Sequence, residues 1–110
     1  MTERVAIVGV GQTRQERNKV YDTFADMVYE ATTLALADAG LSIDQIENVV
    51  SASNDFWDGR TISSMAINDA CGSYDKNISC VEGDGTFAAF YGMTRILSGA
   101  YDTTLVVAHS

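Results

Sequence analysis

The composition of this 110-residue chain, with 46% hydrophobic residues, 20% charged residues and no proline, is that of a globular domain. A chain of this length has room for one hydrophobic core, so we expect a single domain over residues 1–110. Its 15 acidic and 7 basic residues give a formal net charge of -8, which argues against a nucleic-acid or anionic-membrane surface.

The hydrophobic runs and the cysteines indicate a cytoplasmic protein. The early run VAIVGVG is too short for a signal peptide, and no stretch approaches the about 18 apolar residues of a membrane span. Cys71 and Cys80 make no disulfide framework, and together with the single His109 they lack the spacing of metal ligands. We therefore expect reduced thiols and no metal site.

The first half of the chain alternates predicted strands and helices. Residues 4–10, RVAIVGV, form a β-rich apolar run that is typical of a strand buried on both faces. Apolar residues then recur every three or four positions over 23–39 and Gly40 follows them, which predicts an amphipathic helix. A second strand is expected at 46–52 and, after a polar loop, a second helix at 61–71.

The second half of the chain continues this alternation. NISCV, residues 77–81, predicts a third strand, and TTLVVAH, residues 103–109, predicts a fourth. Between them, residues 85–97 predict a helix that is apolar on nearly all sides and so needs cover from a further segment or a partner chain. The fold class is therefore α/β, with a parallel or mostly parallel four-stranded sheet and helices on both faces.

Two loops after predicted strands invite functional interpretations. GVGQT, residues 9–13, has only part of the glycine pattern of a dinucleotide-binding turn, so an ordinary tight turn is the favoured interpretation. The second loop follows the second strand at the edge where parallel sheets place ligands and partners, and a local turn there is as good an explanation as an interface. Its candidate interface residues are Asn54, Asp55, Trp57 and Arg60.

The stretch SCVEGDGTF, residues 79–87, joins the third strand to the apolar helix. A helix N-terminus stabilises an anion, so Asp84 as N-cap and Glu82 just before it already have a structural explanation. The same location activates a thiol, but Cys80 precedes the helix by several residues and lies in an apolar strand. A buried, inert thiol is the favoured interpretation of Cys80, and a reactive thiol is the alternative.

The order of three segments resembles the N-terminal part of the thiolase superfamily. These segments are VAIVGVGQT, the helix end and strand ALADAGLSIDQIENVV, and the end of the apolar helix with the following strand, RILSGAYDTTLVV. The chain looks most like the thiolases similar to sterol-carrier-protein thiolase and the thiolase-like aldolases. The resemblance spans essentially the whole chain and only the first part of a family member, so it implies an incomplete N-terminal βαβαβαβ half of that fold.

The resemblance also implies where the reaction centre lies. Thiolases carry a cysteine nucleophile at the start of the buried helix, and an alignment without gaps places Glu82 there, with Gly85 as the family's following glycine. An alignment shifted by two residues places Cys80 and Gly83 there instead, and the helix start favours Glu82. A carboxylate accepts an acyl group far less well than a thiolate, which makes acyl transfer through Glu82 doubtful. Gly83, Gly85 and Thr86 are then expected to offer backbone N–H groups to an anionic substrate.

The implied activity is carbon–carbon bond cleavage or condensation on an acyl-CoA, of the aldolase or thiolase type, in lipid metabolism. The resemblance implies a coenzyme A thioester as substrate, no bound cofactor, and Glu82 as general base or electrostatic partner in place of the nucleophile. His109 lies outside the family's histidine motif, which belongs to a second half that this sequence lacks. We therefore expect residues 1–110 to be inactive alone.

The implied partners complete the fold or assist it. They are the remaining thiolase half or a second thiolase-like chain, together with a zinc-ribbon and OB-fold subunit of the kind that accompanies related proteins. The alternative function is a non-catalytic thiolase-fold subunit that acts in assembly or dimerisation, in which Glu82 only complements the helix dipole.

Overall fold

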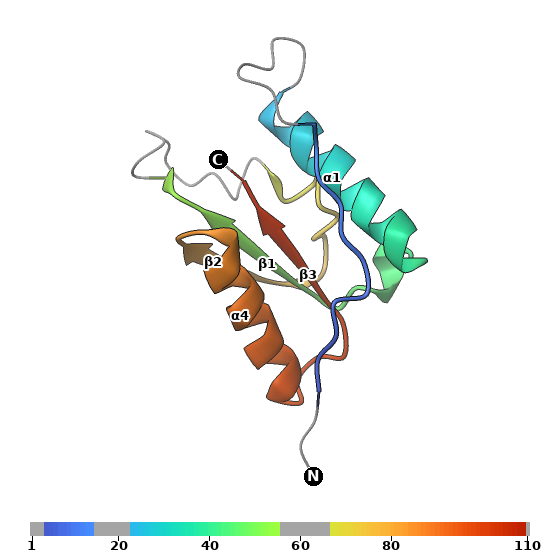
Figure 1. Ribbon diagram of the computed structural model, residues 1–110, viewed down its shortest axis with the longest axis vertical. Helices are drawn as coiled ribbons and strands as arrows, with labels where there is room; N and C mark the ends of the chain where they lie inside the picture. Colours follow the sequence, from blue (N-terminus) through green and yellow to red (C-terminus); the bar gives the residue numbers. More distant parts are fainter. Residues whose placement is uncertain (1–3, 15–22, 56–66, 110) are drawn as a thin grey trace.

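The computed structural model describes residues 4–14, 23–55 and 67–109 of the chain (Figure 1). Helix and strand alternate along the described residues, as the periodicity of the sequence predicts. The elements are α1 (Phe24–Ala39), the short 3-10 helix η1 (Ile43–Gln45), β1 (Asn48–Ser53), β2 (Asn77–Glu82), α4 (Gly85–Leu97) and β3 (Thr104–Ala108).

The sheet is parallel and its strand order is β2-β1-β3. Asn48 at the start of β1 pairs with Asn77 of β2 on one side and with Thr104 of β3 on the other. Residues 48–52 of this central strand are all buried, because neighbouring strands cover both of its edges and side chains cover both of its faces. The predicted parallel α/β architecture is confirmed for these three strands.

Each face of the sheet has its own hydrophobic cluster. On one face Val28 of α1 joins Val49 and Val107, with Ile67 and Cys71 from the turn before β2. On the other face, Val50 and Ala52 pack with Ala88 of α4. Alternate residues of β1 therefore point to opposite layers, and helices cover both faces of the sheet as predicted (Figure 1).

Helix α1 begins with a capping box. The Asp26 amide donates to Thr23 Oγ1 at 3.1 Å, and the Thr23 amide donates to the Asp26 carboxylate at 3.0 Å. These hydrogen bonds to Thr23 hold the pKa of the Asp26 carboxyl below its ordinary value. The helix ends at Gly40, whose φ of 70° is the left-handed conformation that glycine adopts without strain.

Helix α4 lies close to β3 because a glycine faces the strand. A Cβ added to Gly92 would lie 2.9 Å from Val106 Cγ2, so no larger side chain fits between the two elements without a shift. The outer face of the helix is apolar, as the sequence indicates, and carries Phe87, Phe90 and Leu97. In the described part of the chain these three side chains are exposed.

The predicted strand over residues 4–10 is wrong in the described structure. This segment has no strand pairing and runs beside α1, where the Val10 amide donates to Asp38 Oδ2 at 2.9 Å (Figure 1). Side chains that a buried strand would hide are instead open, with Ile7 85% exposed. The described sheet therefore has three strands rather than four, since nothing in it pairs with the free edge of β3.

Only the end of the predicted second helix lies within the described residues. Residues 61–66 lie outside the described residues, and the helical turn at Ile67 continues through turns to Gly72, which has a φ of 69°. The Cys71 amide donates to the Ile67 carbonyl at 3.0 Å, so the predicted stop at Gly72 agrees with the structure.

None of the helices described here is long and apolar enough to cross a membrane.

Candidate functional site

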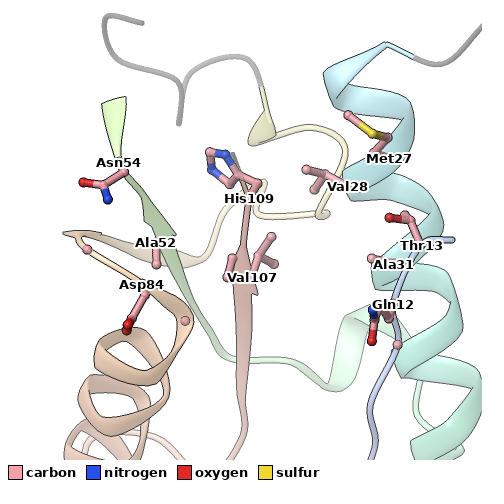
Figure 2. Close-up of a pocket in the computed structure, with 14 residues that line it drawn as sticks. Gln12, Thr13, Met27, Val28, Ala31, Ala52, Asn54, Asp84, Val107 and His109 are labelled. Carbon is pink, nitrogen blue, oxygen red and sulfur yellow. The ribbon is translucent and has the colours of Figure 1, made fainter. Parts of the chain in front are cut away.

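A pocket of about 510 Å³ lies at the carboxyl edge of the parallel sheet (Figure 2). Ala52 of β1 and Val107 of β3 form its floor, since both strands end there. The carboxyl edge is where open parallel sheets place their ligands, because the loops that follow the strands converge on it. Among the described residues, this pocket is therefore the best candidate for a functional site.

The two walls of the pocket come from segments that are far apart in the sequence. Asp84, with its neighbours Gly83 and Gly85, forms one wall at the start of α4, and Gln12 and Thr13 form the other beside α1 (Figure 2). The GVGQT stretch thus takes part in a pocket, although it has no dinucleotide-binding helix after it.

Two polar side chains follow the strands directly into the pocket. Asn54 comes after β1 and His109 comes after β3, and both are half-buried. The His109 amide donates to the Ala52 carbonyl at 3.1 Å, which fixes this residue at the end of the sheet. The sequence gives His109 neither metal-ligand spacing nor the family's histidine motif, but its place directly after a parallel strand is a signal for a pocket residue.

Asp84, rather than Glu82, occupies the tip of α4. Its carboxylate Oδ1 accepts hydrogen bonds from the Thr86 amide at 3.0 Å and the Phe87 amide at 3.2 Å, as an N-cap does. Glu82 is the last residue of β2, has an exposed side chain, and stands two residues before the cap, outside the residues that line the pocket. The expected N-cap role of Asp84 is confirmed, and Glu82 lies just before it, as the last residue of β2.

The three expected amide donors differ in what they already bind. The Gly83 amide donates to the Ser53 carbonyl at 3.0 Å, and the Thr86 amide donates to Asp84, so both are engaged within the chain. For the Gly85 amide, by contrast, the described residues supply no hydrogen-bond acceptor. In this conformation Gly85 is thus the one of the three that fits the predicted role toward an anion.

The candidate interface residues fall on both sides of a boundary of the described structure. Asn54 and Asp55 are half-buried residues directly after β1, and Asn54 lines the pocket. Trp57 and Arg60 lie outside the described residues, so the predicted interface is placed only at its start.

In the described part of the chain, no group of three histidine, cysteine or acidic residues is arranged to hold a metal ion.

The two cysteines have different environments. Cys80 is exposed on β2, which corrects the predicted buried thiol, because β2 is at the edge of the described sheet. Its sulfur accepts a hydrogen bond from Ser51 Oγ at 3.5 Å and lies within the strand rather than at the start of α4. Cys71 is buried, and this burial raises the pKa of its thiol.

We expect iodoacetamide to modify Cys80 and to leave Cys71 unmodified in the folded chain at pH 8. Alkylation needs an accessible thiolate, and Cys71 has neither access nor, with its raised pKa, the thiolate form. Mass spectrometry of tryptic peptides measures the two reactions separately. Unfolding in guanidinium is the control and should make both cysteines reactive; modification of Cys71 at the rate of Cys80 without denaturant would contradict the described core.

The described parallel sheet with its helix layers matches solved structures of thiolase-like fold, which confirms the resemblance at the level of the fold. One solved relative is the priming β-ketosynthase from the R1128 polyketide biosynthetic pathway, with a TM-score of 0.75 and 19% identity over 93% of this chain and 40% of that chain. Another is 3-oxoacyl-[acyl-carrier-protein] synthase III from Aquifex aeolicus VF5, with a TM-score of 0.69 and 16% identity.

The chain spans only part of these relatives. The match to the Aquifex aeolicus VF5 enzyme covers 90% of this chain and 33% of that chain, so the sequence spans about a third of that enzyme's length. No protein-family model matches the sequence, and a search of curated proteins gives no match.

Proposed function

We propose that the chain is the N-terminal segment or subunit of a thiolase-like acyl-CoA enzyme that cleaves or forms a carbon–carbon bond. The observation that carries this proposal is the pocket at the carboxyl edge of the sheet, where the start of α4 meets Asn54 and His109. The shared fold supports it, since the two similar structures are a β-ketosynthase and a 3-oxoacyl-[acyl-carrier-protein] synthase. We place the activity in an assembly with the remaining thiolase half or a second thiolase-like chain; the chain itself spans 40% and 33% of the two similar structures.

The substrate in this proposal is a coenzyme A thioester whose acyl end enters the pocket. The floor of Ala52 and Val107 is apolar and suits an acyl chain, whereas Asn54 and His109 offer polar groups for an oxygen. The Gly85 amide at the N-terminus of α4 is aligned with the positive end of the helix dipole, which favours an anionic enolate at that end of the pocket.

Glu82, which stands outside the pocket lining and two residues before Asp84 of the pocket wall, is proposed as a general base in a retro-aldol cleavage in the intact assembly. It removes the proton from the β-hydroxyl of a β-hydroxyacyl-CoA, and the electron pair of that O–H bond forms the carbonyl of the released product. The bond between the α- and β-carbons breaks, and its electron pair becomes the enolate of the shortened acyl-CoA. Return of the proton to the α-carbon completes the balance, and the reverse sequence is the condensation.

The alternative is a non-catalytic subunit that acts in assembly. The exposed position of Glu82 outside the pocket and the exposed apolar face of α4, with Phe87 and Phe90, favour it. In this case the fold is retained for packing against another chain, and the pocket has no reacting group. A thiolase-like second chain or a zinc-ribbon and OB-fold subunit is the proposed partner in either case.

The test blocks the pocket of the intact assembly with a larger side chain. A tagged copy of the chain is purified from its own cells with its partners, and the assembly is supplied with β-hydroxyacyl-CoA thioesters, followed by mass spectrometry of the shortened acyl-CoA. Asn54→Trp should lower turnover by about 100-fold, because the added ring displaces the acyl end. Asp44→Trp, an exposed position in η1 before β1 begins, is the matched control and should leave turnover unchanged. Equal rates for the two variants, or no turnover by the wild type, would favour the alternative.

A further inference from the structure

Among the described residues that line the pocket at the carboxyl edge of the sheet, two have side chains that titrate, Asp84 and His109. The Asp84 carboxylate is used by the helix, since its Oδ1 accepts the Thr86 and Phe87 amides at 3.0 and 3.2 Å as the cap of α4. His109 is the pocket residue of a type that both gives and takes a proton near neutral pH.

The sheet fixes the position of His109. The residue directly follows β3 (Thr104–Ala108), and its amide donates to the Ala52 carbonyl at 3.1 Å. The side chain is half-buried, and in Figure 2 its ring leans from the end of β3 toward Asn54. A backbone held in this way limits the directions that the ring can take, while the ring stays in reach of whatever occupies the pocket.

The α-carbon of the proposed substrate needs an acid inside the pocket. The Gly85 amide lines the pocket at the start of α4 and favours the enolate oxygen there, which places the α-carbon, two bonds from that oxygen, in the same pocket. Glu82 is exposed and stands outside the residues that line the pocket. The group that takes the β-hydroxyl proton is therefore poorly placed to protonate the α-carbon, whereas His109 lines the space that holds it.

We propose that His109 returns the proton to the α-carbon in the cleavage direction and removes it in the condensation. This inference rests on the proposed function and adds a second acid–base group to it. The N–H electron pair of the imidazolium stays on the ring nitrogen, and the electron pair of the enolate forms the new C–H bond. Glu82 then releases its proton to solvent and His109 takes one from solvent, so both groups return to their starting states.

The same proton transfer predicts a simpler reaction, the exchange of α-hydrogens in an acyl-CoA that has no β-hydroxyl. Neutral His109 takes one α-proton, and the C–H electron pair becomes the enolate at Gly85. The imidazolium exchanges its proton with D2O and returns a deuteron to the α-carbon. No carbon–carbon bond changes in this reaction, and no step of it calls on Glu82.

The test follows this exchange in the intact assembly, purified with its partners through a tagged copy of the chain from its own cells. A saturated short-chain acyl-CoA is supplied in D2O, and mass spectrometry of the thioester measures its deuterium uptake. His109→Gln should slow the uptake by about 100-fold, because glutamine keeps a polar group of similar size that transfers no proton at neutral pH. Tyr74→Gln changes a side chain that is 87% exposed and outside the pocket, and should have the wild-type rate.

A second variant separates proton transfer from packing. In His109→Ala, imidazole added to the solution has room beside the shortened side chain and should restore much of the lost exchange. Pyrazole has nearly the same shape and is a far weaker base, so it should restore none. Copurification of the same partners shows that each variant assembles.

Three results would overturn the inference: wild-type exchange in His109→Gln, no exchange by the wild-type assembly, or a loss of exchange that imidazole does not restore. The proposed function fails in a different way. Exchange that depends on His109, with no cleavage of any β-hydroxyacyl-CoA, would reject carbon–carbon cleavage and leave the proton transfer by His109 in place.

Discussion

Replacing Glu82 by glutamine is expected to lower the carbon–carbon cleavage rate of the intact assembly by about 100-fold or more, the usual contribution of a general base. Glutamine keeps the size and polarity of the side chain and removes its ability to take a proton. Because Glu82 is exposed and lies outside both hydrophobic clusters, the substitution should leave folding unchanged. The rate of formation of the shortened acyl-CoA and the KM for the thioester are measured together, and the loss should appear in kcat.

Two matched variants are the controls for this result. Glu30→Gln changes an exposed carboxylate on α1, away from the pocket, and should have the wild-type rate. Asp84→Asn alters the cap of α4, where asparagine caps nearly as well as aspartate, so the helix should be retained. If Glu82→Gln turns over like Glu30→Gln, Glu82 is not the base, and loss of activity only in Asp84→Asn would move the reacting carboxylate to the pocket wall.

Replacing Ile67 by alanine is expected to lower the free energy of unfolding by about 2–5 kcal/mol. Ile67 is fully buried in the cluster that joins α1 to the sheet, and its truncation leaves a cavity beside Val28 and Val107. Both of these neighbours also line the pocket, so the same substitution loosens a pocket wall. Urea unfolding followed by circular dichroism measures the change.

Ile78→Ala is the control for this loss. Ile78 lies on β2 at the edge of the described sheet, is 37% exposed, and belongs to neither hydrophobic cluster. Its truncation should cost roughly 1 kcal/mol or less, since exposed positions leave little cavity. Equal destabilisation by the two variants would mean that the cluster around Ile67 is not the main core on that side of the sheet.

The elements that the sequence predicts correctly are those whose partners are described. β1 was expected at 46–52 and spans Asn48–Ser53, and α4 has the expected bounds of 85–97, because apolar periodicity and a capping residue define each locally. Residues 4–10 have an equally strong β pattern and form no strand. A strand needs a neighbour as well as a pattern, and the sequence pattern does not report whether that neighbour is present.

Several residues that the sequence singles out line one pocket. Residues after parallel strands converge on one edge, so Asn54, expected from its place after a strand, lies near Gly83 and Gly85, which the resemblance implies. The exposure of Cys80 was not predicted, because an apolar strand has the same sequence pattern at the centre of a sheet as at its edge. Asp84 was expected as the N-cap and is found there, because a capping residue directly before an apolar periodic run is a local signal.

The strand order β2-β1-β3 also determines when the sheet can form during synthesis. The central strand is synthesised first, its neighbour β2 next and its neighbour β3 last. Asn48 can therefore pair with Thr104 only after 56 further residues have been synthesised. Until then one edge of the middle strand has no backbone partner, and the nascent chain carries an open hydrophobic β-segment. Slow translation between residues 54 and 103 would lengthen that interval, and with it the time during which the unpaired edge can associate with another chain.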